Sequence, residues 1–500
     1  MKKAIFIVLF FFLISFSIFS NDQNSIIYLR AADSTSLDPG KVHTIYSADI
    51  VSNIFEGLVK YDLKNHKISP CLAERWESSE NGLKWNFYLR KNVFFHDGTH
   101  FDSSAVLHSF LVRKKKMNTD YPEWKISFPN IVSITSSGKY KIEIILKKPY
   151  APFLTLLTFP IAYIVHPKSY LSKDFYPVGT GPFIFEKWER GKFISLMGNK
   201  KYWNGTVKLL KVIFKIYRNQ ESAINMIKNG QADVMELKSI ELYQNFLGLK
   251  KFIITQSPPG GIFFIVFNTT KYPFNRVEFR RGFAHLIKKK VMIKTIFQDF
   301  IQSATTPIPY TFPEFNKKIT DYKLSIKKSI SLFRQAGIKS GFKCSVSFLS
   351  NDKIEHRIFE TFRRQTAKAG IILIKDPLPL NKLFTKLENN NFDIAIRGWV
   401  SGPDPDLYFF SNFTNIKGNS NFGKYSNPEL LNILLKARET LDKKKRKQLY
   451  FKAQEIIHTD LPWISLFYQR AMIIHSRNIK NINFNLNSQI LFENAYISDN

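Results

Sequence analysis

The sequence predicts a mixed α/β protein of about three domains or lobes. Its 500 residues correspond to roughly three units at about 150 residues per domain. A hydrophobic content of 44% and an aromatic content of 15% supply enough apolar material for sizeable packed cores, which excludes a disordered or collagen-like chain. Segments with strand periodicity alternate irregularly with segments of helical periodicity, and this order favours the mixed class.

In the first third of the chain, apolar spacing predicts three strand regions and two helices. Residues 25–30 form a short apolar run, and 48–58 carry apolar residues at helical spacing. Residues 83–90 alternate as a half-buried strand does, and Asp102 can cap a helix that follows it. Residues 133–146 supply two short strands joined at Gly138.

Further along, the pattern predicts a hairpin, more strands and more helices. The predicted segments are a hairpin over 183–197, a helix over 221–229, strands over 233–237 and 262–267, a helix started by Asn427-Pro428, and a helix capped by Asp442 that ends before Pro462. The run 262–267 is apolar almost throughout, which is typical of a strand covered on both faces.

The first twenty residues have the pattern of a secretory signal peptide. Lys2 and Lys3 precede an apolar run over residues 4–19, and polar sequence follows at once. We expect cleavage between Ser17 and Ser20, with an uncleaved anchor as the alternative. No cysteine lies near the end of the run, so lipid modification is not expected. No later segment is apolar for long enough to cross a bilayer, and the sequence therefore predicts an exported, periplasmic protein.

Charge and cysteine content exclude other classes of protein. The formal net charge is +33, but basic runs recur along the chain, from 113–116 to 443–447, instead of gathering in one stripe. We interpret them as solvated helix faces and expect no nucleic-acid partner; adhesion to acidic surfaces stays open. Two cysteines, Cys71 and Cys344, are too few for a disulfide scaffold. We expect both to be free and buried in different lobes, although they could pair in an oxidising compartment.

The sequence contains no recognisable catalytic or metal-binding motif. Zinc-type histidine pairs, a nucleophile elbow and a phosphate loop are all absent from the sequence. Gly179-Thr180-Gly181 precedes a proline and a strand, so it cannot open a helix for a pyrophosphate. The only tight carboxylate cluster is Asp404-Pro405-Asp406, and a glycosidase would need a second carboxylate across a cleft. We therefore expect no catalytic residue, metal or cofactor, and the sequence favours a binding protein.

A series of motifs resembles one family over essentially the whole mature chain. In order, they are Leu37-Asp38-Pro39, residues 53–61 (NIFEGLVKY), 70–76 (PCLAERW), 85–90 (WNFYLR), 93–98 (VFFHDG), 101–106 (FDSSAV), 178–183 (VGTGPF), 199–203 (NKKYW), 267–269 (FNT), 273–274, 277–283, and Trp399 followed by Asp404-Pro405-Asp406. The chain is similar in these motifs to the extracytoplasmic solute-binding proteins of family 5, the peptide- and nickel-type receptors of ABC importers.

This resemblance implies a periplasmic-binding-protein clamshell (type II, cluster C), with two main lobes and an extra inserted lobe. Lobe I would comprise 21–58, 178–258 and 471–500, lobe II would be 59–177, and lobe III would be 259–470. Two crossing segments, near 256–261 and 468–473, would form the hinge, and Pro258-Pro259-Gly260-Gly261 has the composition of such a joint. The implied partners are a peptide ligand and the permease and ATPase subunits at the inner membrane, and we expect a monomer.

The ligand-binding residues implied are Trp399, Asp404, Asp406, Gly260 and Gly261. Peptide binders of the family that recognise a free amino terminus carry an aspartate three residues after this tryptophan, where this chain has Gly402. Asp404 and Asp406 are then the nearest candidates for an ammonium partner, and a turn with a helix cap is the other interpretation. Trp399 lines the cleft or belongs to the core.

Alternative functions stay open at this point. They are an exported hydrolase with Asp404 in a cleft, or a family-5 binder of a non-peptide ligand such as a metal chelate or a sugar. A nickel chelate is less favoured than a peptide, because no histidine accompanies these positions.

Overall fold

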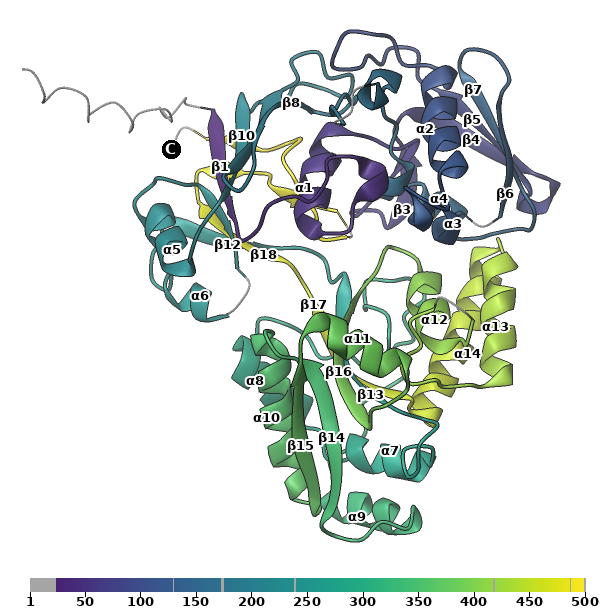
Figure 1. Cartoon of the computed structure of the whole chain (residues 1–500), viewed down its shortest axis with the longest axis vertical. Helices are drawn as coiled ribbons and strands as arrows, with labels where there is room; N and C mark the ends of the chain where they lie inside the picture. The colour runs from purple at the N-terminus through teal and green to yellow at the C-terminus, as the bar shows by residue number, and fades with distance from the viewer. Residues whose placement is uncertain are drawn as a thin grey trace, which may run out of the picture.

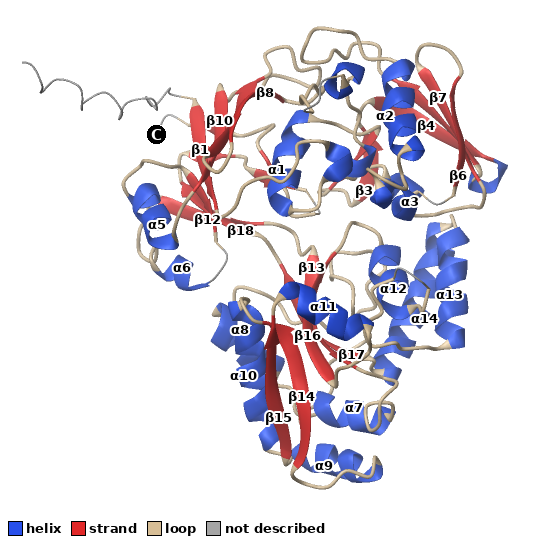
Figure 2. Cartoon of the chain, viewed as in Figure 1, coloured by secondary structure: helices blue, strands red, loops and turns tan. Residues whose placement is uncertain are grey.

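The computed structural model describes residues 24–498, apart from 129, 172–174, 238–239, 417–418 and 486. The signal peptide predicted over residues 1–20 lies outside these described residues. Figure 1 shows two bodies, which we call the upper body (24–256 and 471–498) and the lower body (257–470). Helices and strands are mixed in both (Figure 2), so the predicted mixed α/β class is confirmed. Within the described ranges, no helix combines the length and apolarity needed to span a bilayer.

The upper body contains a seven-stranded sheet in the order β12-β18-β11-β1-β10-β9-β8. Its strands are β1 (Ser25–Arg30), β8 (Phe183–Glu189), β9 (Phe193–Gly198), β10 (Lys211–Ile216), β11 (Val234–Glu236), β12 (Phe252–Gln256) and β18 (Met472–Ser476), and the helices near it are α1 (Ile45–Ile54), α5 (Gln220–Lys228) and α6 (Ile240–Gln244). β1 runs parallel to both of its neighbours, whereas β8 and β9 form the predicted antiparallel hairpin. The sheet therefore joins segments from the beginning, middle and end of the chain.

A second, four-stranded sheet in the order β4-β5-β7-β6 completes the upper body. It comprises β4 (Ala73–Ser79), β5 (Lys84–Leu89), β6 (Ile131–Ser136) and β7 (Lys141–Leu146), and nearby lie the β2 (Val59–Asp62) and β3 (Lys67–Pro70) ribbon and helices α2 (Ser103–Lys115), α3 (Pro122–Ser127) and α4 (Phe153–Leu156). Trp85, Phe87 and Leu89 on β5 alternate with less buried residues, as predicted. Asp102 caps α2 by accepting a hydrogen bond from Ser104 N at 2.9 Å.

The lower body is built on a five-stranded sheet in the order β15-β14-β16-β13-β17. Its strands are β13 (Gly261–Phe267), β14 (Phe342–Leu349), β15 (Ile371–Leu378), β16 (Ile394–Val400) and β17 (Trp463–Gln469). The helices are α7 (Val277–Ala284), α8 (Lys289–Phe297), α9 (Ile326–Gln335), α10 (Lys353–Ala367), α11 (Leu380–Glu388), α12 (Pro405–Phe413), α13 (Pro428–Glu439) and α14 (Lys443–Asp460). Asn427 and Asp442 cap α13 and α14, as predicted.

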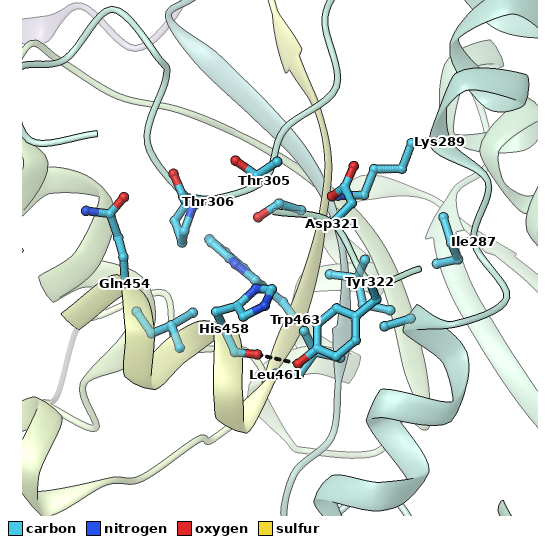
Figure 3. Close-up of a pocket in the computed structure, with 15 residues that line it drawn as sticks. Ile287, Lys289, Thr305, Thr306, Asp321, Tyr322, Gln454, His458, Leu461 and Trp463 are labelled. Carbon is cyan, nitrogen blue, oxygen red and sulfur yellow. Dashed lines mark hydrogen bonds and ion pairs between the residues drawn. The ribbon is translucent and has the colours of Figure 1, made fainter. Parts of the chain in front are cut away.

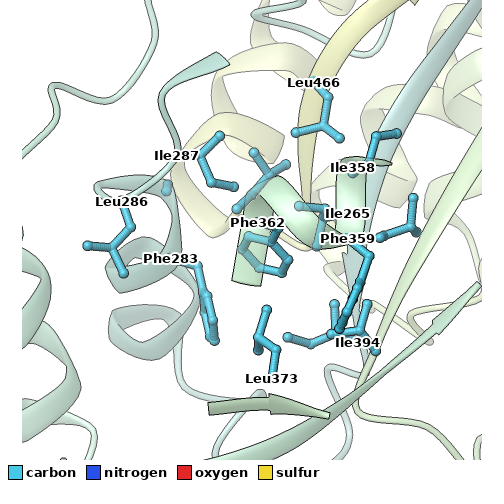
Figure 4. Close-up of a cluster of buried hydrophobic side chains, with 14 of the residues drawn as sticks. Ile265, Phe283, Leu286, Ile287, Ile358, Phe359, Phe362, Leu373, Ile394 and Leu466 are labelled. Atoms are coloured by element: carbon cyan, nitrogen blue, oxygen red, sulfur yellow. The ribbon is translucent and has the colours of Figure 1, made fainter. Parts of the chain in front are cut away.

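Every residue of β13 is buried, because both faces of the lower sheet are covered. Phe263, Ile265 and Phe267 belong to one core cluster with residues of α7 to α10. Figure 4 shows Ile265 within this cluster. Ile262 and Phe264 alternate with them and join the other cluster with α11 to α14. The prediction of a doubly covered strand is therefore confirmed.

The state of the two cysteines agrees with the prediction from the sequence, whereas the end of one helix does not. Cys71 and Cys344 are both free and buried, as predicted. The helix predicted over 48–58 instead ends at Ile54. The next residues are extended because they hydrogen-bond to neighbouring segments: Leu72 N donates to Gly57 O at 3.2 Å, and Ala73 N donates to Leu58 O at 2.9 Å.

Short C-terminal strands finish the chain on the upper body. They are β19 (Ile479–Lys480), β20 (Asn483–Phe484), β21 (Ile490–Leu491) and β22 (Tyr496–Ile497). Ile490 N donates to Asp49 Oδ1 and Phe492 N to Asn53 Oδ1, both at 3.0 Å, so this segment is fastened to α1. The division into lobes I, II and III with the boundaries given above remains a prediction.

Candidate ligand-binding cleft between the two bodies

The chain crosses between the two bodies twice, from β12 to β13 and from β17 to β18 (Figure 1). The crossing segments are paired with each other: Ser257 N donates to Ala471 O at 2.9 Å, and Gly260 N donates to Gln469 O at 3.1 Å. Ala471 N also donates to Ser257 Oγ at 2.9 Å. A paired two-segment joint lets two bodies move relative to each other while it fixes the edge about which they turn.

Gly260 and Gly261 lie in the first crossing segment, next to the end of β16. Gly260 O accepts hydrogen bonds from Ser401 N at 3.2 Å and from Tyr408 OH at 3.0 Å. A Cβ atom on Gly261 would come within 2.9 Å of Trp399 O. Close backbone approach therefore explains a glycine at position 261.

Trp399 lies on β16 opposite Ile262 of β13. It is half-buried and packs against the core cluster shared by α11 to α14. Its buried Nε1 has no hydrogen-bond partner among the described residues. The ring thus belongs partly to the core and retains one unused donor, and its contact with a ligand remains a prediction.

Asp404 and Asp406 are buried at the start of α12, each beside a guanidinium group. Asp404 is the N-cap and accepts from Asp406 N at 2.8 Å. Arg446 donates to both of its oxygens, at 2.9 and 2.6 Å. Arg438 Nε lies 3.2 Å from Asp406 Oδ2. Burial raises the pKa of Asp406 to about 7, against the effect of Arg438. These contacts are those of a helix cap and two buried ion pairs, which engage both carboxylates within the lower body.

Gly402 meets an aromatic ring of the upper body. A Cβ atom at this position would lie 2.0 Å from Phe159 Cζ, so the two bodies touch here. A second set of contacts centres on α13: Ala151 N donates to Arg438 O at 2.7 Å, and Arg438 Nη2 donates to Tyr150 OH at 3.1 Å. The bodies are thus in direct contact on this side of the cleft.

A cavity of about 120 Å³ lies beside these contacts. The upper body supplies nearly all of its lining and the lower body supplies Pro403. The lining residues are Ser52, Asn53, Phe55, Glu56, Gly57, Val59, Lys60, Tyr61, Cys71, Thr158, Tyr163, Pro182, Tyr202, Pro403, Asn485, Asn487, Leu491 and Glu493. Because residues from both bodies enclose it, this cavity is the part of the cleft best suited to hold a ligand group.

Glu56 is buried at this cavity and fully hydrogen-bonded. It accepts from Thr180 Oγ1, Tyr202 OH and Trp203 Nε1, each at 2.8 Å. Burial raises its pKa, although these three donors act in the opposite direction. Glu56 therefore positions the aromatic pair Tyr202 and Trp203 and has little remaining capacity to bind a ligand.

Lys60 and Glu493 are the other charged residues of the cavity. Glu493 Oε1 accepts from Asn204 Nδ2 at 2.9 Å and from Tyr202 OH at 3.4 Å. Burial acts to lower the pKa of Lys60, but the nearby Glu493, Cys71 and Glu56 raise it overall. One cation and one anion are thus available at the same cavity.

A second cavity, of about 40 Å³, lies inside the lower body (Figure 3). Tyr322 OH donates to His458 O at 2.7 Å, and Lys289 is paired with Asp321 beside it. This volume holds about one water molecule, so the cavity cannot be the main ligand site.

Sequence reasoning missed several residues of the cleft. Glu56 and Tyr202 lie within motifs that carry the family resemblance, but no role was assigned to them. Glu493 and Arg446 had no local signal, because their partners lie far away in the sequence.

Residues 67–421 match the family described as bacterial extracellular solute-binding proteins, family 5, in its middle region. The chain belongs to this family. The match covers well over half of the sequence and includes β13, β16 and the start of α12.

Relatives and a solved structure agree with this assignment. Heme-binding protein A of Haemophilus influenzae is 27% identical over 92% of this chain and 90% of its own length. Glutathione-binding protein GsiB of Escherichia coli is 24% identical over 89% of both chains. The periplasmic binding protein DppA of Helicobacter pylori, solved with the peptide STSA, is 28% identical over 95% of this chain and 98% of its own, with a TM-score of 0.80.

These findings establish the function at a coarse level. This family-5 protein is the substrate-binding component of an ABC transporter and has the family's clamshell fold. It is a binding protein and not an enzyme, so the alternative of a hydrolase that uses Asp404 is wrong.

Proposed function

We propose that this protein captures peptides in the cleft between its two bodies and delivers them to the permease of an ABC importer. The observation that carries the proposal is its similarity to the H. pylori DppA, which was solved with the peptide STSA. The cavity chemistry supports a polar ligand, because Lys60, Glu493, Asn485 and Asn487 line it. A ligand that contacts both bodies stabilises the closed state, since those contacts are lost on opening.

We further propose that residues 1–20 direct export and are then removed. The test is the intact mass of the protein recovered from the periplasm of an expressing bacterium, which should lack about the first twenty residues. Retention of the segment in the membrane fraction would favour the anchor alternative.

Binding should be measured on residues 21–500 after unfolding and refolding have removed any co-purified ligand. Calorimetry and thermal melting would compare peptides of two to eight residues with hemin, a nickel–histidine chelate and simple sugars. A peptide at 100 times its dissociation constant stabilises the folded state by about 2.7 kcal/mol, so we expect a clear rise in melting temperature. Chromatography should recover the peptide intact. Stabilisation by hemin, nickel–histidine or sugars alone would overturn the peptide assignment.

A further inference from the structure

The charged termini of a peptide need counter-charges in a closed cleft. Burying an ammonium or a carboxylate without a partner costs several kcal/mol, so the cleft must supply groups of both signs. Asp404 and Asp406 are already engaged by Arg446 and Arg438. Glu56 already accepts three hydrogen bonds. Asp404 and Glu56 thus have both oxygens engaged, whereas Asp406 pairs through Oδ2 and its buried Oδ1 has no hydrogen-bond partner among the described residues.

Glu493, unlike Asp406, lines the cavity and has one oxygen without a described hydrogen bond. Both hydrogen bonds described for it go to Oε1, and no described residue hydrogen-bonds to Oε2. The backbone beside it is fixed, because Phe492 N donates to Asn53 Oδ1 of α1 at 3.0 Å. A carboxylate on a fixed backbone, with one unused oxygen at a cavity, is a preorganised acceptor.

Lys60 provides the opposite charge at the same cavity. It lies on β2, its side chain is exposed, and none of the described residues forms an ion pair with it. Glu493 is the largest of the influences that raise its pKa, so this ammonium stays charged at neutral pH. Lys60 and Glu493 thus share a cavity without being joined by a described ion pair.

We propose, on the basis of the peptide function above, that the cavity recognises short zwitterionic peptides. Glu493 accepts the ligand's ammonium group, and Lys60 donates to its carboxylate. The volume of about 120 Å³ equals the share of about four water molecules in the liquid, so it has room for the charged end groups of a short peptide, and the peptide side chains lie outside it. Pro403 of the lower body lines the same cavity, so closure encloses both charged ends.

The test uses one short peptide in four forms: unmodified, acetylated at the amino terminus, amidated at the carboxyl terminus, and blocked at both ends. Wild-type protein should lose about 10- to 100-fold in affinity for each block, as expected for hydrogen bonds to charged groups. Glu493→Gln should remove the effect of acetylation and keep that of amidation. Lys60→Gln should do the reverse. Lys64→Gln, an exposed lysine beside the same ribbon, should behave as wild type.

This crossed pattern separates recognition from structural damage. A variant that merely loosens the cleft would lose affinity for all four forms by the same factor, and that result would overturn the proposal. Wild-type affinity that is indifferent to both blocks would overturn it too, while the peptide function would stand. If none of the four forms binds and peptide pools also fail, the peptide function itself falls and this proposal falls with it.

Discussion

Asp404 differs from an ordinary helix cap in having a buried guanidinium partner. Asp442 also caps a helix, accepting from Lys445 N at 2.8 Å, but it is exposed. Both aspartates satisfy a backbone N–H that the helix leaves free. Only Asp404 also accepts from both terminal nitrogens of Arg446. We therefore expect the charge of Asp404 to contribute more to folding stability than its capping hydrogen bond does.

We expect Asp404→Asn to destabilise the unliganded protein by about 3–5 kcal/mol, because it leaves the buried Arg446 without a counter-charge. Asn still caps a helix well, so Asp442→Asn is the matched control and should leave stability nearly unchanged. Urea unfolding of both variants checks this. An equally small effect at both positions would show that the Arg446 pair contributes little.

The buried Asp49 makes the free energy of unfolding depend on pH. Burial raises its pKa to about 7, although Ile490 N and Arg30 act to lower it. In the unfolded chain the pKa of an aspartate is about 4. The folded state therefore keeps the proton between about pH 4 and 7 while the unfolded state loses it, so stability falls as pH rises through this window.

Asp49→Asn should remove this component while its side-chain oxygen can still accept from Ile490 N. Between pH 5 and 7 we expect the wild-type free energy of unfolding to fall more steeply than that of the variant, by up to about 1.4 kcal/mol per pH unit. The difference should level off above about pH 7. Urea unfolding at pH 5, 6, 7 and 8 measures it, and parallel curves would contradict it.

Helix α14 begins with an unfavourable charge arrangement. Lys443, Lys444 and Lys445 occupy its first turn, where the partial positive charge of the helix terminus disfavours cations. By contrast, α13 carries Lys436 and Arg438 in its last turn, where cations are favoured. The two adjacent helices thus offer opposite tests of the same electrostatic effect.

Lys445→Glu should stabilise the protein by about 0.5–1 kcal/mol at low salt. It reverses the unfavourable charge and places a glutamate three residues after the N-cap, where it can complete a capping box. Lys436→Glu, at the end of α13, should act in the opposite direction. Both effects should shrink in high salt. Thermal melting at two salt concentrations measures them, and a destabilising Lys445→Glu would contradict the argument.

Gly179 and Gly181 allow close packing of the backbone against the end of α1. Gly181 N donates to Ile54 O at 2.9 Å, and a Cβ atom at Gly179 would lie 2.1 Å from that same oxygen. The two glycines therefore let the chain approach the end of α1 closely. This packing role agrees with the prediction that they do not form a phosphate loop.

Contacts outside the cavity hold the two bodies together. Arg438 connects them, because it joins Asp406 in the lower body to Tyr150 and Ala151 in the upper body. Its guanidinium also lies 3.6 Å from the ring centre of Phe410, which fixes its orientation. Such contacts stabilise the closed arrangement without touching a ligand.

Tyr150→Phe should therefore weaken ligand binding although Tyr150 does not line the cavity. Loss of a hydrogen bond from a charged donor costs about 1.5–3 kcal/mol, so we expect affinity to fall by about 10-fold or more, mainly through faster dissociation. The melting temperature without ligand should barely change. Tyr140→Phe, in the turn between β6 and β7 of the upper body, serves as the control. Wild-type affinity in Tyr150→Phe would show that this contact is absent from the bound form.

The sequence alone could predict features that depend on near neighbours. The caps at Asp102, Asn427 and Asp442 involve residues two or three positions away. The buried strand over 262–267 follows from its own composition. The ordered motifs identified the family and with it the clamshell. Between 268 and 426 the sequence suggested only a helix cap at Asp404, as one of two interpretations, and Asp404 does cap α12. The apolar residues 371–374 at the start of β15 were not predicted as a strand, and Ile372 and Ile374 among them are exposed.

The partners of the charged residues at the site are set by tertiary structure and could not be predicted from the sequence. Asp404 meets a guanidinium 42 residues away, and Glu493 meets Asn204 across 289 residues. Periodicity and capping are local because they depend on one turn of backbone. Ion pairs and cavities depend on how distant segments pack, since the free energy of a buried charge is set by every group around it. The fold class and the family thus follow from local sequence features, whereas long-range packing sets which carboxylates are paired with a guanidinium group.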